Sequence, residues 1–148
     1  MYKFSPIFMS VACGISLSPI FDTLPLVAHQ QHQATTAGAI TATIHLDPND
    51  TPHAGHPSET WFMLTQENGT PILLDNCMCQ VNVLDDQNQA IAELLPLSQI
   101  SVEGQSAIGT EITFPEPGSY TVILNGTSED GSFAPFELSF PVVAIPAP

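Results

Sequence analysis

The chain has 148 residues, of which 15 are acidic and only one, Lys3, is a lysine or arginine. Its formal net charge is -14 at pH 7, and 43% of its residues are hydrophobic, which is enough for one core. This composition excludes nucleic acid as a partner, because nothing in the chain can neutralise phosphates, and an anionic membrane surface would repel the mature domain. It favours a protein partner with a basic surface.

Residues 1–28 are predicted to be a signal peptide. Lys3 supplies the positive charge, an uncharged apolar run extends from Phe4 to Phe21, and Leu26-Val27-Ala28 forms a small-residue cleavage site. Because the run is about 18 residues long, an uncleaved membrane anchor is the alternative. Both readings predict an exported protein, and cleavage would leave a mature chain without any lysine or arginine.

The chain after this segment shows the pattern of an all-β protein. Residues 29–38 are polar and are predicted to form a flexible arm. Short segments with period-two alternation of apolar residues follow, separated by turn residues such as Asn68-Gly69 and Asn125-Gly126. They are predicted to be strands at Ile40–Leu46, Glu59–Thr65, Cys77–Leu84, Ala90–Leu95, Ile108–Phe114, Ser119–Asn125 and Phe136–Val143. We therefore expect an immunoglobulin-like antiparallel β-sandwich of about seven strands over residues 39–143, followed by a tail at 144–148.

Three residues are predicted to be structural. Trp61 is expected at the centre of the core. In Pro117-Gly118-Ser119-Tyr120, the tyrosine stands just inside the penultimate strand, where its hydroxyl can turn back onto the preceding corner as in a tyrosine corner. The alternative for Tyr120 is an ordinary core aromatic residue.

Cys77 and Cys79 are the strongest candidates for chemistry. Two cysteines of an exported protein usually form a disulfide. Residues i and i+2 of a regular strand are too far apart for a good bridge, so a disulfide here is expected to need a bulge or a turn. A labile redox-active disulfide, two free buried thiols, and a soft dithiol site for Cu(I) or Zn(II) are the alternatives.

His53 and His56 lie in the loop after the first predicted strand of the domain. Their spacing allows two imidazoles to converge, and together with Cys77 and Cys79 they are candidates for a mixed metal site that would bind copper. The alternative is that both are solvated loop histidines, because the sequence does not place this loop against the strand that carries the cysteines.

Residues spread over positions 39–143 also carry a family resemblance. The chain resembles a group of uncharacterised exported proteins of cyanobacteria in His45-Leu46-Asp47-Pro48, Ala54-Gly55, Pro57, Trp61-Phe62, Cys77-x-Cys79, Phe114-Pro115-x-Pro117-Gly118-x-Tyr120 and Pro135-Phe136-Glu137-Leu138. More distantly, its Pro-Gly-x-Tyr strand start is similar to that of YtkA-like and FixH-like sandwich domains. The resemblance implies a periplasmic or thylakoid-lumenal location, and it includes the two cysteines but neither His53 nor His56.

No catalytic constellation stands out. The serines have no Gly-x-Ser-x-Gly context, no glycine-rich phosphate loop is present, and no carboxylate pair is distinguished from the general acidity. The sequence therefore predicts a protein that is not an enzyme but an exported acidic interaction module. The alternative is a periplasmic or lumenal copper protein that uses Cys77 and Cys79 with nearby histidines.

Overall fold

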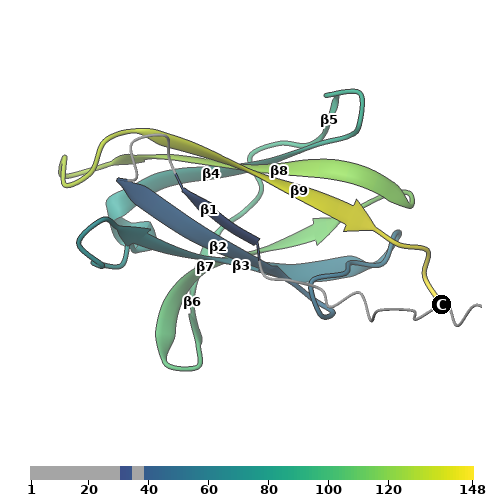
Figure 1. Ribbon diagram of the computed structural model, residues 1–148, viewed down its shortest axis with the longest axis horizontal. Coiled ribbons are helices and arrows are strands. Elements are labelled where there is room, and N and C mark those ends of the chain that lie inside the picture. Colours follow the sequence, from purple (N-terminus) through teal and green to yellow (C-terminus); the bar gives the residue numbers. More distant parts are fainter. Residues whose placement is uncertain (1–30, 35–38) are drawn as a thin grey trace, which may run out of the picture.

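The computed structural model of the chain describes residues 31–34 and 39–148. The predicted signal peptide, and the predicted arm apart from 31–34, lie outside the described residues. The described residues form nine strands and one short 3-10 helix. The strands form two antiparallel sheets that pack face to face (Figure 1). The predicted all-β sandwich is confirmed. No helix of the described residues is long and apolar enough to cross a membrane.

The first sheet has five strands in the order β1-β2-β3-β7-β6. Every neighbouring pair in it is antiparallel. Its strands are β1 (Gln31–Ala34), β2 (Ile40–Leu46), β3 (Pro57–Gln66), β6 (Ser98–Val102) and β7 (Gln105–Thr113).

The second sheet has four strands in the order β5-β4-β8-β9. The helix η1 (Leu74–Asn76) leads into β4 (Cys77–Leu84), and the other strands are β5 (Ala90–Ala92), β8 (Gly118–Ser128) and β9 (Phe136–Ala144). The order β2-β3-β7-β6 against β4-β8-β9 matches the A-B-E-D and C-F-G sheets of an immunoglobulin domain, with β1 and β5 added at one edge of each sheet.

The core lies between the two sheets because both present one apolar face. Inward residues alternate strictly with outward ones along β2 and along β9. Phe62 of β3 and Phe140 of β9 are completely buried, and their ring centroids lie 5.7 Å apart across the interior. With hardly any charged side chain able to form an ion pair, this burial is the main stabilising contribution.

The described residues form nine strands instead of the predicted seven or so, several strand ends are shifted, and four segments differ in kind from the predictions. Residues 31–34, predicted to be part of a flexible arm, form β1 and pair with β2. Ser98–Val102 form β6, whose polar sequence gave no strand signal; the Glu103-Gly104 turn, with φ of 50° and 81°, joins it to β7. Strand β8 continues through Asn125-Gly126, which is not a turn. Ile145 of the predicted tail pairs with His53.

Candidate functional site

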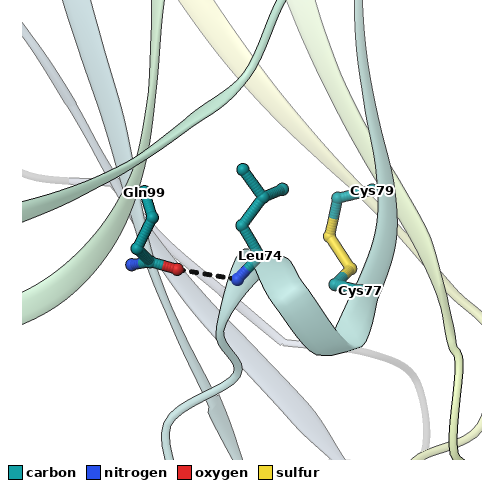
Figure 2. Close-up of a disulfide and its surroundings, with 4 residues drawn as sticks. All are labelled: Leu74, Cys77, Cys79 and Gln99. Atoms are coloured by element: carbon teal, nitrogen blue, oxygen red, sulfur yellow. Dashed lines mark hydrogen bonds between the residues drawn. A yellow bond between two sulfur atoms is a disulfide. The ribbon is translucent and has the colours of Figure 1, made fainter.

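Cys77 and Cys79 are joined by a disulfide at the start of β4, beside the helix η1 (Figure 2). Their side chains lie on the same face of β4 as the buried Val81 and Val83, as the alternation predicts. Met78 between them points outward and is 57% exposed. Cys77 is buried, whereas Cys79 is partly accessible, so solvent reaches the bridge from the Cys79 side.

Of the predicted bulge or turn, β4 has no bulge at the cysteines, whereas the 3-10 helix η1 ends at Asn76, directly before Cys77. The pairing of β4 with β8 continues without interruption from Cys77 to Leu84. Two residues of regular strand rise by about 6.6 Å, whereas the two Cα atoms here are 5.0 Å apart. Strand β4 is therefore shortened at its first residues and keeps its register with β8. Strand β5 pairs with β4 only at Val83 and Leu84, away from the cysteines.

Gly126 of β8 provides the space that the disulfide occupies. It pairs directly with Cys79 and with Phe136, one on each side. A Cβ atom at this position would lie 2.7 Å from Cys77 Sγ and 2.9 Å from the Phe136 ring. The glycine that looked like a turn signal is thus a packing residue in the middle of a strand.

The chemistry around the disulfide favours a structural bridge over a redox centre. A thiol attacking the accessible Cys79 sulfur would displace a thiolate at the buried Cys77. The described residues contain no lysine or arginine that could stabilise that thiolate. In the chain-entropy relation, a disulfide that closes a three-residue loop adds about 1.6 kcal/mol to the free energy of unfolding, so this disulfide is a modest local stabilisation.

A small network of polar side chains lies next to this disulfide. Ser128, which pairs with Cys77, donates its hydroxyl to Asp130 Oδ1 at 2.7 Å, and the Ser132 amide donates to the same oxygen at 2.9 Å. These hydrogen bonds hold the pKa of Asp130 well below its ordinary value, although the carboxylate is exposed. Asn76, the residue before Cys77, donates to the Ser132 hydroxyl and so connects the network to the helix η1.

The histidines lie at the opposite end of the sandwich from the disulfide, which corrects the predicted mixed metal site. His53 pairs with Ile145, one residue beyond Ala144, which pairs with Gly118. Cys79 pairs with Gly126, and the eight steps along the strand from residue 118 to residue 126 span roughly 27 Å.

His56 belongs to the same loop as His53, since its amide donates to the His53 carbonyl. Among the described residues, no group of three or more His, Cys, Asp or Glu side chains converges as a set of metal ligands. Cys77, Cys79, His53 and His56 therefore do not form one site in this fold.

The predicted tyrosine corner is present. Tyr120 donates its hydroxyl to the Glu116 carbonyl at 2.8 Å, and the Glu116 amide lies 3.3 Å from the same oxygen. The buried ring packs against Phe114 with centroids 5.0 Å apart. Gly118 begins strand β8, between the corner and the tyrosine.

Trp61 is not a central core residue, so that prediction is wrong. Its neighbour Phe62 points inward and is fully buried, whereas Trp61 lies half-buried on the outer face of the five-stranded sheet. There it stacks on His45 of β2, with ring centroids 5.2 Å apart and planes inclined by 8°. His45 Nδ1 lies 3.7 Å from the Asp50 carboxylate, the one contact among the described residues that becomes an ion pair when its histidine is protonated.

A hollow of about 400 Å³ lies beside Trp61, over β3, β7 and the strand β6; we call it the Trp61 hollow. Trp61 pairs across the sheet with Gly109, which has no side chain, and Gly109 pairs with Ser98. The Ile100 side chain lies over this glycine and forms part of the lining of the hollow. Its lining includes Glu59, Trp61, Pro96, Leu97, Ile100 and Glu111. Trp61 also borders a second hollow of about 410 Å³ on the side of Met63 and Val102.

The comparisons with known proteins reveal a likeness of fold. No protein-family model and no curated protein sequence matches the chain. A DUF4426 family protein of Pseudomonas aeruginosa PAO1 superposes with a TM-score of 0.58 at 11% identity, covering 80% of this chain and all of that one. FetP of uropathogenic Escherichia coli strain F11, produced recombinantly in the periplasm of E. coli, superposes with a TM-score of 0.54 at 10% identity, covering 81% of this chain and 99% of FetP. The resemblance to exported cyanobacterial proteins stays a prediction.

Proposed function

We propose that this protein is an exported, non-enzymatic interaction module that docks a protein with a basic surface. The observation that carries the proposal is the charge of the folded domain. All of the 15 acidic residues except Asp22 lie among the described residues, which include no lysine or arginine. Such a surface attracts basic partners and repels acidic ones.

The remaining features agree with a docking role. The disulfide stabilises the start of β4 rather than offering a reactive sulfur, and the outer face of the five-stranded sheet carries the half-buried Trp61 beside a hollow. Tryptophan residues that line pockets are frequent anchors in protein interfaces. The uncharged run from Phe4 to Phe21 supports export, with a periplasm or thylakoid lumen as the compartment.

The first experiment is to express the full chain in a Gram-negative host and determine the intact mass of the exported protein under native and denaturing conditions. We expect cleavage after Ala28 and a mass about 2 Da below that of the reduced mature chain, because a disulfide forms with loss of two hydrogens. Two free thiols with stoichiometric copper retained through a chelator would instead establish the copper alternative.

The second experiment measures binding of the same exported protein to surfaces coated with polylysine or polyglutamate. We expect binding to polylysine that weakens as NaCl is raised, and no binding to polyglutamate. Absence of binding to polylysine at low ionic strength would refute the docking of a basic partner.

A further inference from the structure

The Trp61 hollow has an aromatic wall on one side. His45 stacks on Trp61 from β2, whereas Gly109 and Ile100, on the far side of β3, come from β7 and β6. The second face of the indole is therefore directed toward the hollow. Ile100 lies over Gly109, next to Trp61, since a Cβ on that glycine would lie only 3.0 Å from the Ile100 Cδ1 atom.

Two carboxylates stand at the edge of this hollow. Glu59 of β3 and Glu111 of β7 are directly paired across the two strands, both exposed and both on the outward face. Side chains in such a pair have Cβ atoms about 5 Å apart, and like charges at this distance destabilise a sheet. No lysine or arginine of the described residues can separate or neutralise them. A cation from outside the domain would relieve this repulsion.

A hydrogen bond connects two segments at the rim of the hollow. Thr110 donates its hydroxyl to the Pro96 carbonyl at 2.9 Å, which attaches the segment between β5 and β6 to strand β7 at the rim of the hollow. The apolar walls come from Trp61, Leu97 and Ile100. An occupant therefore needs an apolar stem and a cationic, planar head that can stack on an indole.

Arginine meets these requirements better than any other side chain. Its guanidinium stacks on aromatic faces and forms paired hydrogen bonds with carboxylates, whereas a lysine ammonium acts as a point charge. A second copy of this chain cannot supply the occupant from its domain, because that domain has no arginine and would bring further carboxylates. A neutral ligand such as a sugar could stack on Trp61 but would leave Glu59 and Glu111 in mutual repulsion.

Resting on the function proposed above, we propose that the Trp61 hollow binds an arginine side chain of the basic partner protein. The guanidinium stacks on the free face of Trp61 and its charge lies between Glu59 and Glu111. The surrounding acidic surface steers the partner, and this hollow anchors it.

The test is a titration of the full, exported protein with three short peptides of sequence Gly-Ser-X-Ser-Gly, blocked at both ends, in which X is arginine, lysine or citrulline. Citrulline has the shape of arginine without its charge. Trp61 is the single tryptophan of the chain, so its fluorescence reports on the hollow. We expect the arginine peptide to bind about 5-fold or more tighter than the citrulline peptide and roughly 2-fold tighter than the lysine peptide.

Variants locate the site. The double variant Glu59→Gln/Glu111→Gln should weaken the binding of the arginine peptide by about 5-fold, as measured by the NMR shift of the Gly109 amide. The same variant should raise the thermal midpoint of the protein, because the like-charge pair is gone. The control Glu129→Gln/Glu137→Gln removes the same charge from other exposed positions and should change the affinity less than 2-fold. Trp61→Leu keeps an apolar wall and should weaken binding by about 5-fold.

Several outcomes would overturn the inference. Equal binding of the citrulline and arginine peptides would mean that the hollow takes a neutral ligand. Equal weakening by the two double variants would mean that only overall charge matters. Displacement of the peptide by millimolar CaCl2, with unchanged binding at matched ionic strength of NaCl, would mean that the two carboxylates hold a metal ion. In each case binding to polylysine would survive, whereas failure of the proposed function would abolish polylysine binding as well.

Discussion

At the scale of single residues, Tyr120 contributes through one polar atom as well as through its buried ring. Its hydroxyl bonds to both the carbonyl and the amide of Glu116 and so fixes the corner that leads into β8. Tyr120→Phe keeps the ring and removes these contacts. We expect the free energy of unfolding to fall by about 1 kcal/mol. Urea denaturation with an unchanged m-value measures this, and an unaltered midpoint would show that the hydrogen bonds contribute nothing net.

Asp130 sets a pH dependence with a definite sign. Hydrogen bonds from Ser128 and Ser132 lower its pKa in the folded protein from the ordinary value of about 3.8, so folding favours the ionised form. This contribution to stability is complete above about pH 3.8 and is lost progressively as the pH falls below that value. Because Asp130 is exposed, solvent screening keeps the effect small.

The variant Asp130→Asn keeps the acceptor oxygen but cannot titrate. We expect its thermal midpoint to fall less steeply than that of the wild type between pH 4 and pH 2, with little difference in slope above pH 5. Asp75→Asn, whose carboxylate lies in the neighbouring helix η1, is the control for general loss of charge. A wild-type slope in Asp130→Asn would contradict the assignment.

At the scale of elements, the disulfide and the strand opposite it form one packing unit. Gly126→Ala places a methyl group against both Cys77 Sγ and the Phe136 ring, and overpacking of this kind costs about 1–3 kcal/mol. In the Cys77→Ala/Cys79→Ala background the clash with sulfur is absent. We expect Gly126→Ala to cost less there, with a coupling energy of at least about 0.5 kcal/mol measured by chemical denaturation. Additive effects would mean that the glycine is needed only for Phe136.

Strand periodicity predicted the elements better than it predicted their orientation. The alternation Ile40, Ala42, Ile44 and Leu46 identified β2 and its buried face correctly, because its other face is polar. Strand β3 has large apolar residues on both faces, with Trp61 and Phe62 adjacent. Nothing local decides which face of β3 meets the core, so the sequence does not show that Trp61 points outward and Phe62 inward.

The site residues were predictable only where neighbours in the sequence determine the geometry. The tyrosine corner needs just Glu116 and Tyr120, four residues apart, and was found. The separation of His53 from Cys79 depends on the lengths of β8 and β9 and on pairings between distant segments. The Trp61 hollow likewise depends on Gly109 lying beside Trp61, a pairing over 48 positions that the sequence does not display.

At the scale of the whole molecule, repulsion among the negative charges of the domain opposes folding. The net charge of -14, with the histidines neutral, is spread over a sandwich in whose described residues only His45 and Asp50 come within ion-pair distance. Self-repulsion is stronger in the compact state than in the unfolded chain, where the charges lie further apart. Packing of the two sheets therefore overcomes the electrostatic repulsion within the domain. The same negative charges would attract a basic partner.

This balance predicts that added salt stabilises the protein. Raising NaCl from about 0.01 M to about 1 M shortens the Debye length from roughly 30 Å to roughly 3 Å and screens the repulsion, while almost no ion pair is lost. We expect the thermal midpoint to rise by on the order of 5 °C, equivalent to about 1 kcal/mol. Glycine at matched osmolality, which is zwitterionic and screens poorly, should have a smaller effect. A midpoint that is constant or falls with NaCl would show that the charges are too far apart, or too well hydrated, to oppose folding.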